Sequence, residues 1–103
     1  MRRKFEPFNS DVIRKEFFSL PATDATALRI AMAAYQMELG TGCVIKDYKD
    51  GLWMLKDASR VQGRCLFFRQ EPHRLVVVLI YKKESDEAPF RVTDAARKRM
   101  EGI

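Results

Sequence analysis

The sequence predicts a small α+β protein in which an antiparallel sheet is covered on one side by a pair of helices. Three observations support this fold class. Apolar residues recur at helical spacing through the first forty residues, which is typical of amphipathic helices. From residue 52 the pattern changes to β-rich segments joined by short links. The end of the chain returns to helical spacing. With 103 residues, the chain is expected to form one domain over residues 1–103.

The N-terminal part predicts an edge strand followed by two helices. Residues 2–8 can form a short strand, and the proline within it restricts that strand to a sheet edge. A first helix is expected over residues 11–20, capped by the Asn-Ser pair before it and ended by the proline after it. Thr23 and Asp24 are candidate caps for a second helix, and Gly40 is its expected C-terminal glycine.

The middle of the chain predicts a three-strand meander. Its strands are expected at residues 52–57, 64–70 and 74–82, with a Glu-Pro-His hairpin turn between the last two. The apolar run Leu75–Tyr81 has no polar alternation, so we expect a central strand covered on both faces. An acidic loop then leads to Pro89, which suits the first turn of a final helix through FRVTDAARKRM. The expected order is β-α-α-β-β-β-α.

The positive charge of the chain is unevenly distributed. The net charge is +5 at pH 7, and the segment from Lys56 to Lys83 contains seven basic residues against two acidic ones. A concentration of cations on a small domain attracts polyanions such as nucleic acids. The same charge is also compatible with an acidic protein partner or with solubility alone.

The sequence lacks the motifs of common enzyme classes and of metal sites. It has no Gly-rich phosphate loop, no GxSxG, no HExxH and no zinc spacing, so neither a metal nor a cofactor is expected. Cys43 and Cys65 are expected to be reduced, partly buried side chains. No segment has the length of a membrane span, and the N-terminus lacks the apolar stretch of a secretory signal. We therefore expect a cytoplasmic protein without membrane association.

Four cations are expected at one end of the predicted meander. Lys56 ends its first strand, Arg64 begins the second, and Lys82 and Lys83 end the third. The end of one antiparallel strand lies beside the start of the next, so these side chains are expected to meet at one rim of the sheet. Such a cluster is suited to binding a phosphate group. The alternative is that the cations protect strand ends against aggregation.

Several features occur in a fixed order in the second half of the chain. They are LWMLK (52–56), GRCLFF (63–68), YKK (81–83), Pro89, and Ala95 with Arg99. In this order they resemble the RelE superfamily of toxins from bacterial type II toxin–antitoxin systems, and most closely its HigB-like, phage-derived branch. That branch typically has an LWELR strand, a YRVLYF strand, an apolar strand ending in FxKK, and an ExxxAxxR helix. Met54, Lys56 and Gly63 depart from this pattern, which has Glu, Arg and an aromatic residue there.

The resemblance implies a RelE-like fold and a ribosome-dependent endoribonuclease that cleaves translated mRNA without a metal. The 2′-OH of the RNA would attack the adjacent phosphorus, and preorganised cations would stabilise the developing charge. Lys56, Arg64 and Lys82 are the implied catalytic residues, with Arg64 on the phosphate and Lys56 beside it. Lys83 would hold the RNA backbone together with Lys82. A lysine crowded by other cations loses its proton more easily, so one of them could act as general base.

The resemblance also implies RNA-binding residues and partners. Tyr81 would stack on a base or orient the phosphate, with core packing as the alternative. Arg60, Arg97 and Arg99 would contact ribosomal RNA, or be solvated. The expected partners are mRNA, the ribosome, and a cognate antitoxin of helix-turn-helix or other small type that silences the toxin.

Two further functions remain open at this point. The first is a ParE-like toxin, which shares the fold but inhibits DNA gyrase and cleaves nothing. Toxins of that type generally lack the cationic set, so the predicted cluster favours cleavage. The second is a non-catalytic basic module that binds nucleic acid or an acidic protein.

Overall fold

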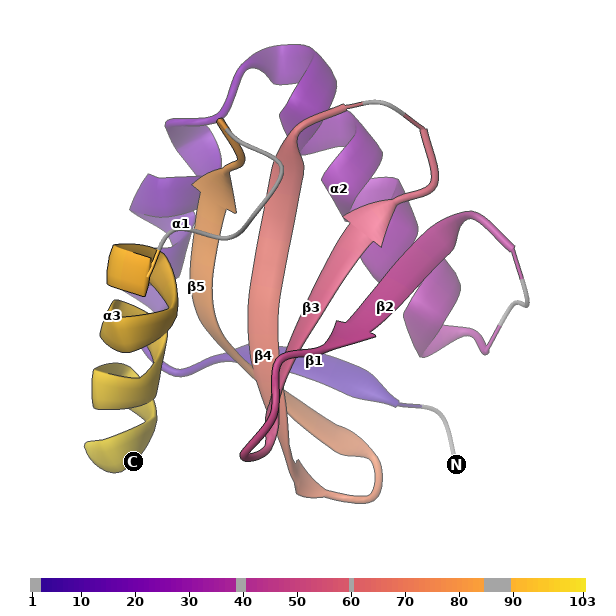
Figure 1. Cartoon of the computed structure of the whole chain (residues 1–103). Helices are drawn as coiled ribbons and strands as arrows, with labels where there is room; N and C mark the ends of the chain where they lie inside the picture. Colours follow the sequence, from indigo (N-terminus) through magenta and orange to yellow (C-terminus); the bar gives the residue numbers. More distant parts are fainter. Residues whose placement is uncertain (1–2, 39–40, 60, 85–89) are drawn as a thin grey trace.

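The fold is of the α+β class, as the sequence predicts (Figure 1). The computed structural model describes residues 3–38, 41–59, 61–84 and 90–103. The elements are β1 (Lys4–Pro7), α1 (Ser10–Phe18), α2 (Ala22–Gln36), β2 (Cys43–Asp47), β3 (Leu52–Asp57), β4 (Gly63–Glu71), β5 (Arg74–Lys82) and α3 (Phe90–Glu101). The roles expected for Gly40 and Pro89 lie outside the described residues.

The sheet has five strands in the order β1-β5-β4-β3-β2. The predicted meander is present as β3, β4 and β5, which pair antiparallel. Two features differ from the prediction. The edge strand β1 pairs parallel with β5, so the sheet is mixed and not purely antiparallel. The prediction also lacked β2, which pairs antiparallel with β3 and forms the other edge.

The helix caps are partly as predicted. Asn9 caps α1, because its side-chain oxygen accepts hydrogen bonds from the backbone N–H groups of Asp11 at 3.1 Å and Val12 at 3.2 Å. Pro21 occupies the cap position of α2 and offers no side-chain hydrogen bond. Asp24, which the sequence suggested as a cap, lies inside the first turn of α2 and binds elsewhere.

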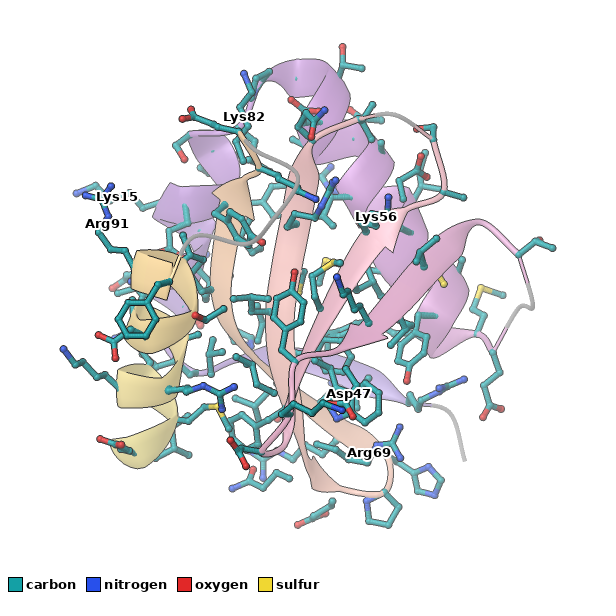
Figure 2. All side chains as sticks on the ribbon, viewed as in Figure 1. Lys15, Asp47, Lys56, Arg69, Lys82 and Arg91 are labelled. Atoms are coloured by element: carbon teal, nitrogen blue, oxygen red, sulfur yellow. The ribbon has the colours of Figure 1, made fainter. Side chains whose placement is uncertain are left out.

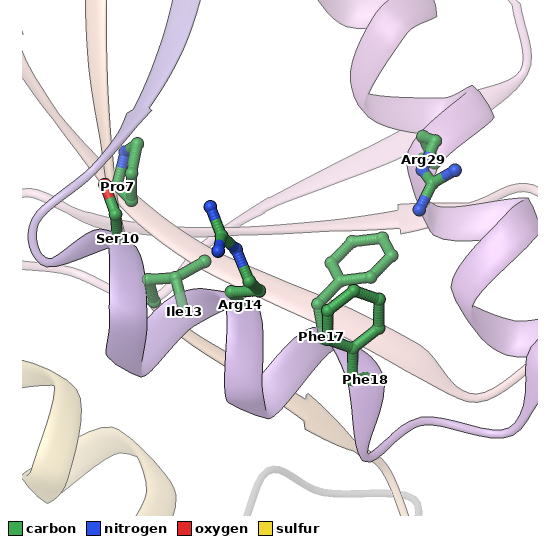
Figure 3. A pocket seen from close by; sticks show the side chains of 7 residues that line it. All are labelled: Pro7, Ser10, Ile13, Arg14, Phe17, Phe18 and Arg29. Atoms are coloured by element: carbon green, nitrogen blue, oxygen red, sulfur yellow. The ribbon is translucent and has the colours of Figure 1, made fainter.

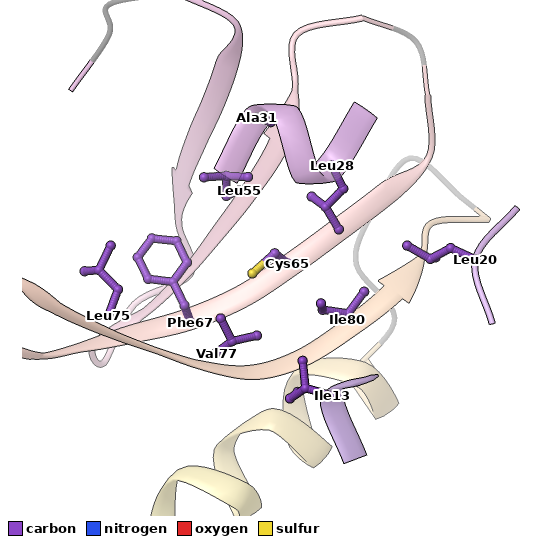
Figure 4. Close-up of a cluster of buried hydrophobic side chains, with 10 residues drawn as sticks. All are labelled: Ile13, Leu20, Leu28, Ala31, Leu55, Cys65, Phe67, Leu75, Val77 and Ile80. Atoms are coloured by element: carbon purple, nitrogen blue, oxygen red, sulfur yellow. The ribbon is translucent and has the colours of Figure 1, made fainter. Parts of the chain in front are cut away.

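The sheet has an apolar core on each face. On one face, α1 and α2 cover a cluster that includes Leu28, Leu55, Cys65 and Phe67 (Figure 4). On the other face, Ala96 of α3 packs into a second cluster. In Figure 1, α1 and α2 lie behind the sheet, whereas α3 lies beside β5. The predicted helix pair is therefore confirmed, and α3 covers only the β5 side of the opposite face.

A β-bulge in β5 decides which residues face each core. Leu66 of β4 pairs with Leu79, but the next residue of β4 pairs with Val77, so Val78 has no partner in the ladder. The bulge reverses the alternation along β5. Val77 and Ile80 therefore belong to the core under α1 and α2, whereas Val78 and Leu79 belong to the core under α3. All residues from Leu75 to Ile80 are buried, as predicted for a central strand.

None of the described helices is long and apolar enough to cross a membrane.

Candidate functional site

Three of the predicted site residues form one row across the sheet. Arg64 of β4 pairs directly with Tyr81 of β5. Leu55 pairs with Cys65, so one further step along the ladder brings Lys56 of β3 opposite Arg64. Side chains alternate along each strand, and Leu55 and Cys65 face α1 and α2. The row Lys56–Arg64–Tyr81, called here the Arg64 row, therefore lies on the opposite face, which α3 covers only in part.

Arg64 is the most unusual member of the Arg64 row. Its side chain is buried, with a relative exposure of 4%. One guanidinium nitrogen, Nη1, donates to the carbonyl oxygens of Val61 at 2.9 Å and Gly63 at 3.0 Å, but Nε is buried without a partner. Within the described part of the chain, no carboxylate forms a salt bridge with Arg64. A buried charge is costly unless it is paired, so this position favours an anionic ligand.

Tyr81 places a second buried polar atom beside Arg64. Its phenol oxygen makes no hydrogen bond of good geometry within the described residues. Burial raises the pKa of the Tyr81 phenol well above its ordinary value, Tyr48 adds to the increase through its charge and as a nearby hydrogen-bond acceptor, and the charge of Arg64 opposes it. Tyr81 therefore remains protonated at neutral pH, as a buried hydrogen-bond donor close to Tyr48 and Arg64.

The two lysines at the end of β5 lie on opposite faces of the sheet. Lys83 lies on the face of the Arg64 row, and Lys82 lies on the face that α1 and α2 cover. Lys82 pairs with Gly63, where an added Cβ would lie 3.5 Å from the Leu28 side chain of α2. The Lys82 position therefore faces the helix pair. The backbone N–H of Lys83 donates to the Gln62 carbonyl at 2.8 Å, which extends the ladder and returns Lys83 to the face of the Arg64 row.

The predicted rim is nevertheless present at one end of the sheet. Figure 2 shows Lys56 and Lys82 toward the same end, with Asp47 and Arg69 near the opposite end. None of the lysines at this rim, Lys56, Lys82 and Lys83, forms a salt bridge within the described residues. The sequence thus places these cations at the correct rim, but it does not reveal that Lys82 faces away from the other two.

Asp24 fixes the loop that precedes Arg64. Its carboxylate accepts a hydrogen bond of 2.7 Å from the backbone N–H of Gln62. The chain also passes close to α2 here, since a Cβ on Gly63 would lie 3.1 Å from the Asp24 carbonyl oxygen. Glycine permits this close approach. Asp24 therefore anchors the start of β4, and with it the backbone that carries Arg64.

Two residues of the site face were missed by sequence reasoning. Lys46 pairs with Met54, whose side chain lies in the α3-side core, so Lys46 faces the same side as the Arg64 row. Its ammonium group lies 5.7 Å from the centre of the Tyr48 ring. Tyr48 packs against the α3-side core and is near enough to raise the pKa of Tyr81. The two adjacent β-branched residues Val44 and Ile45, which favour a strand, were the signal that could have revealed this pair.

Arg97 and Arg99, which were expected to contact RNA, have intramolecular partners. Arg97 donates to the backbone carbonyl of Tyr48 at 2.8 Å and thereby holds the β2–β3 turn. Arg99 donates to the carbonyl of Val78 at 2.8 Å and forms a 2.8 Å salt bridge with Glu16. Both arginines stabilise the fold. Arg60, the third arginine of this group, lies outside the described residues.

His73 and the acidic groups form no metal centre in the described part of the chain. His73 lies in the β4–β5 turn, at the end of the sheet away from the Arg64 row, as expected. No cluster of three His, Cys, Asp or Glu side chains suited to a metal ion occurs among the described residues.

No protein-family model matches this chain, and no curated protein matches it in sequence.

Proposed function

We propose that this chain is a RelE-like toxin that cleaves translated mRNA by a metal-independent mechanism. The observation that carries the proposal is the buried guanidinium of Arg64, which forms no salt bridge with a carboxylate of the described residues, beside the buried phenol of Tyr81. A phosphodiester offers a charged acceptor to the first group and a hydrogen-bond acceptor to the second. Lys56 and Lys83 add positive charge on the same face.

In the proposed reaction, the RNA supplies its own nucleophile. The 2′-oxygen forms a bond to the adjacent phosphorus while the bond from phosphorus to the 5′-oxygen breaks, which leaves a 2′,3′-cyclic phosphate and a free 5′-hydroxyl. The 2′-OH passes its proton to a general base, proposed to be a lysine of the cluster, and the protonated base returns a proton to the leaving 5′-oxygen. Arg64 stabilises the charge that develops on the phosphate, and Tyr81 donates a hydrogen bond to it.

The setting of this reaction follows from the resemblance. The ribosome presents the mRNA in the cytoplasm, and a cognate antitoxin neutralises the toxin. No metal or cofactor takes part in the proposed step, because the cations of the sheet supply the positive charge.

The test is cleavage of mRNA on translating ribosomes, read by mapping the new 5′ ends. We expect cuts within translated codons, and Arg64→Gln is expected to reduce cleavage by about 100-fold or more. Arg69→Gln is the matched control, because Arg69 is an exposed arginine of the same strand that lies near the opposite end of the sheet. Thermal unfolding of both variants verifies that they are folded.

Two outcomes would refute the proposal. A folded Arg64→Gln variant that retains full cleavage would remove the assigned role of the Arg64 row. Growth arrest with DNA damage and intact mRNA would instead indicate a ParE-like gyrase inhibitor.

A further inference from the structure

A groove lies along α1, between the end of β1 and α2 (Figure 3). It is lined by Pro7, Ser10, Ile13, Arg14, Phe17, Phe18 and Arg29. Its volume is about 320 Å³, enough for a few large apolar side chains and at the lower end of the range for binding pockets. Because α1 and α2 cover the face of the sheet opposite to the Arg64 row, the groove does not belong to the candidate RNA site.

The groove exposes an aromatic side chain that the fold does not use. Phe18 is 74% exposed, although its neighbour Phe17 packs against the core. Burying a phenylalanine contributes roughly 1.5–3 kcal/mol, and the free chain forgoes most of this at Phe18. Single exposed apolar residues are common on protein surfaces, but here the ring borders a groove, which is typical of interaction sites.

The charges around the groove are all of one sign. Arg14 and Arg29 are among its lining residues, and no carboxylate is. Neither arginine forms a salt bridge within the described residues. The Arg29 guanidinium lies 5.3 Å from the centre of the Phe17 ring, so that it borders the apolar floor. Glu16 is the acidic residue of α1 closest in sequence to Arg14 and Phe18. It does not line the groove and instead binds Arg99 and the backbone of β5.

We propose that this groove is a docking site for an acidic amphipathic helix of a partner protein. Apolar side chains at positions i, i+3, i+4 and i+7 of that helix would cover Phe18 and enter the groove. Carboxylates on either side of them would pair with Arg14 and Arg29. An RNA base would use only the exposed Phe18 ring and the arginines, through stacking and charge. The apolar side chains of a helix would also cover the aliphatic part of the groove at Pro7 and Ile13, so the lining fits an amphipathic helix better.

The test uses a designed peptide as the probe. The peptide is a fluorescein-labelled amphipathic helix with Leu and Phe on one face and Glu on its flanks, and binding to the full chain is followed by fluorescence anisotropy. A second peptide with Lys in place of every Glu is the charge control. We expect the acidic peptide to bind, the basic peptide to bind at least about tenfold more weakly, and added salt to weaken the acidic complex.

Variants of the protein locate the binding site. Phe18→Ser and Arg14→Glu are each expected to weaken the acidic peptide by about tenfold or more, the effect of losing one central interface residue. Phe90→Ser and Arg91→Glu are matched controls, because both residues are exposed on α3. These controls are expected to bind like the parent chain. All four positions are exposed, so thermal unfolding should show folded variants.

Four results would overturn the proposal. Unchanged peptide binding by Phe18→Ser would mean that the peptide binds elsewhere on the protein. Equal binding of the acidic and basic peptides would mean that Arg14 and Arg29 do not select an acidic partner. A dimer of the parent chain that Phe18→Ser converts to a monomer would show that a second copy covers the groove. Displacement of the peptide by single-stranded RNA would make the groove a nucleic-acid site. Since the Arg64 row faces the other way, failure here leaves the mRNA cleavage assay unaffected.

Discussion

Arg64 and Tyr81 are directly paired residues of β4 and β5, and each has a buried polar atom without a partner among the described residues. Side chains of a directly opposed pair are neighbours on one face of a sheet. Proteins satisfy most buried polar groups, and exceptions are often found at functional sites. The pair therefore combines a cation and a neutral donor at a position where the described residues supply no carboxylate and leave Nε of Arg64 without an acceptor.

The first prediction concerns the Tyr81 hydroxyl. Tyr81→Phe removes a buried oxygen that makes no hydrogen bond of good geometry within the described residues, so the free energy of unfolding should change by less than about 1 kcal/mol. Affinity for RNA should fall at the same time, because the donor to the phosphate is lost. Urea denaturation and RNA-binding titrations measure the two effects. Tyr35→Phe is the control, because Tyr35 packs on the face of α1 and α2.

A loss of stability of more than about 1 kcal/mol in Tyr81→Phe would contradict this prediction. It would mean that the hydroxyl has a partner in the folded chain, since removal of a satisfied hydrogen bond typically costs that amount.

The second prediction separates the two adjacent lysines at the end of β5. Lys83→Gln should weaken RNA binding and cleavage more than Lys82→Gln does, because Lys83 shares the face of Arg64 whereas Lys82 pairs with Gly63 toward α2. Each variant serves as the control for the other, because both substitutions remove one positive charge at the same rim of the sheet. Titrations of single-stranded RNA at two salt concentrations provide the measurement. Equal effects would indicate that both ammonium groups reach the RNA.

The outcome for these lysines illustrates what the sequence predicts and what it does not. The apolar run from Leu75 to Tyr81 predicts a central strand, and its end correctly marks the cationic rim. However, a run without polar residues contains no alternation that could reveal a bulge. The bulge at Val78 reverses the facing of every later residue, so Tyr81 and not Lys82 shares a face with Arg64.

The remaining differences have similar physical causes. The strand β2 was not predicted because it is short and ends in a turn where Lys49 and Asp50 adopt positive φ angles, which these residues rarely do. Tyr48 was missed together with this strand. Arg97 and Arg99 look like a solvated basic helix face in the sequence. Their acceptors are backbone carbonyls far away along the chain, which composition and spacing cannot predict.

The third prediction concerns the link between α1, β5 and α3. Glu16 accepts the backbone N–H of Ile80 at 3.0 Å and pairs with Arg99, which in turn donates to the carbonyl of the bulged Val78. Arg99→Met should lower the free energy of unfolding by about 1.5–3 kcal/mol, because it removes charge-assisted bonds at a partly buried position. Glu16→Gln should be milder, since an amide oxygen can still accept from Ile80.

A double-mutant cycle tests this link. Urea denaturation of both single variants and of the double variant should give a coupling energy of at least about 0.5 kcal/mol. Lys98→Met is the control, because its pair with Asp94 is more exposed and surface pairs contribute little. Additive effects of Glu16 and Arg99 would mean that the two residues act independently. RNA binding by folded Arg99→Met should equal that of the parent chain.

The last prediction is a loss of stability at alkaline pH that originates at Cys65. This thiol is fully buried beneath α2, and burial raises its pKa far above the ordinary thiol value. Below the ordinary pKa of about 8.5, both folded and unfolded chains keep the proton. Above it, the unfolded chain releases a proton that the folded chain retains. The free energy of unfolding should therefore fall by up to about 1.4 kcal/mol per pH unit from this group.

Urea denaturation between about pH 8 and pH 10 tests this, a window that ends where tyrosines begin to ionise. Cys65→Ala should be less stable at pH 8, because it leaves a cavity in the core, but its stability should decline less steeply as the pH rises. Cys43→Ala is the matched control. Its thiol is only half-buried and its pKa is also raised, so the substitution should flatten the curve less. Parallel curves for Cys65→Ala and the parent chain would show that Cys65 ionises normally in the folded protein.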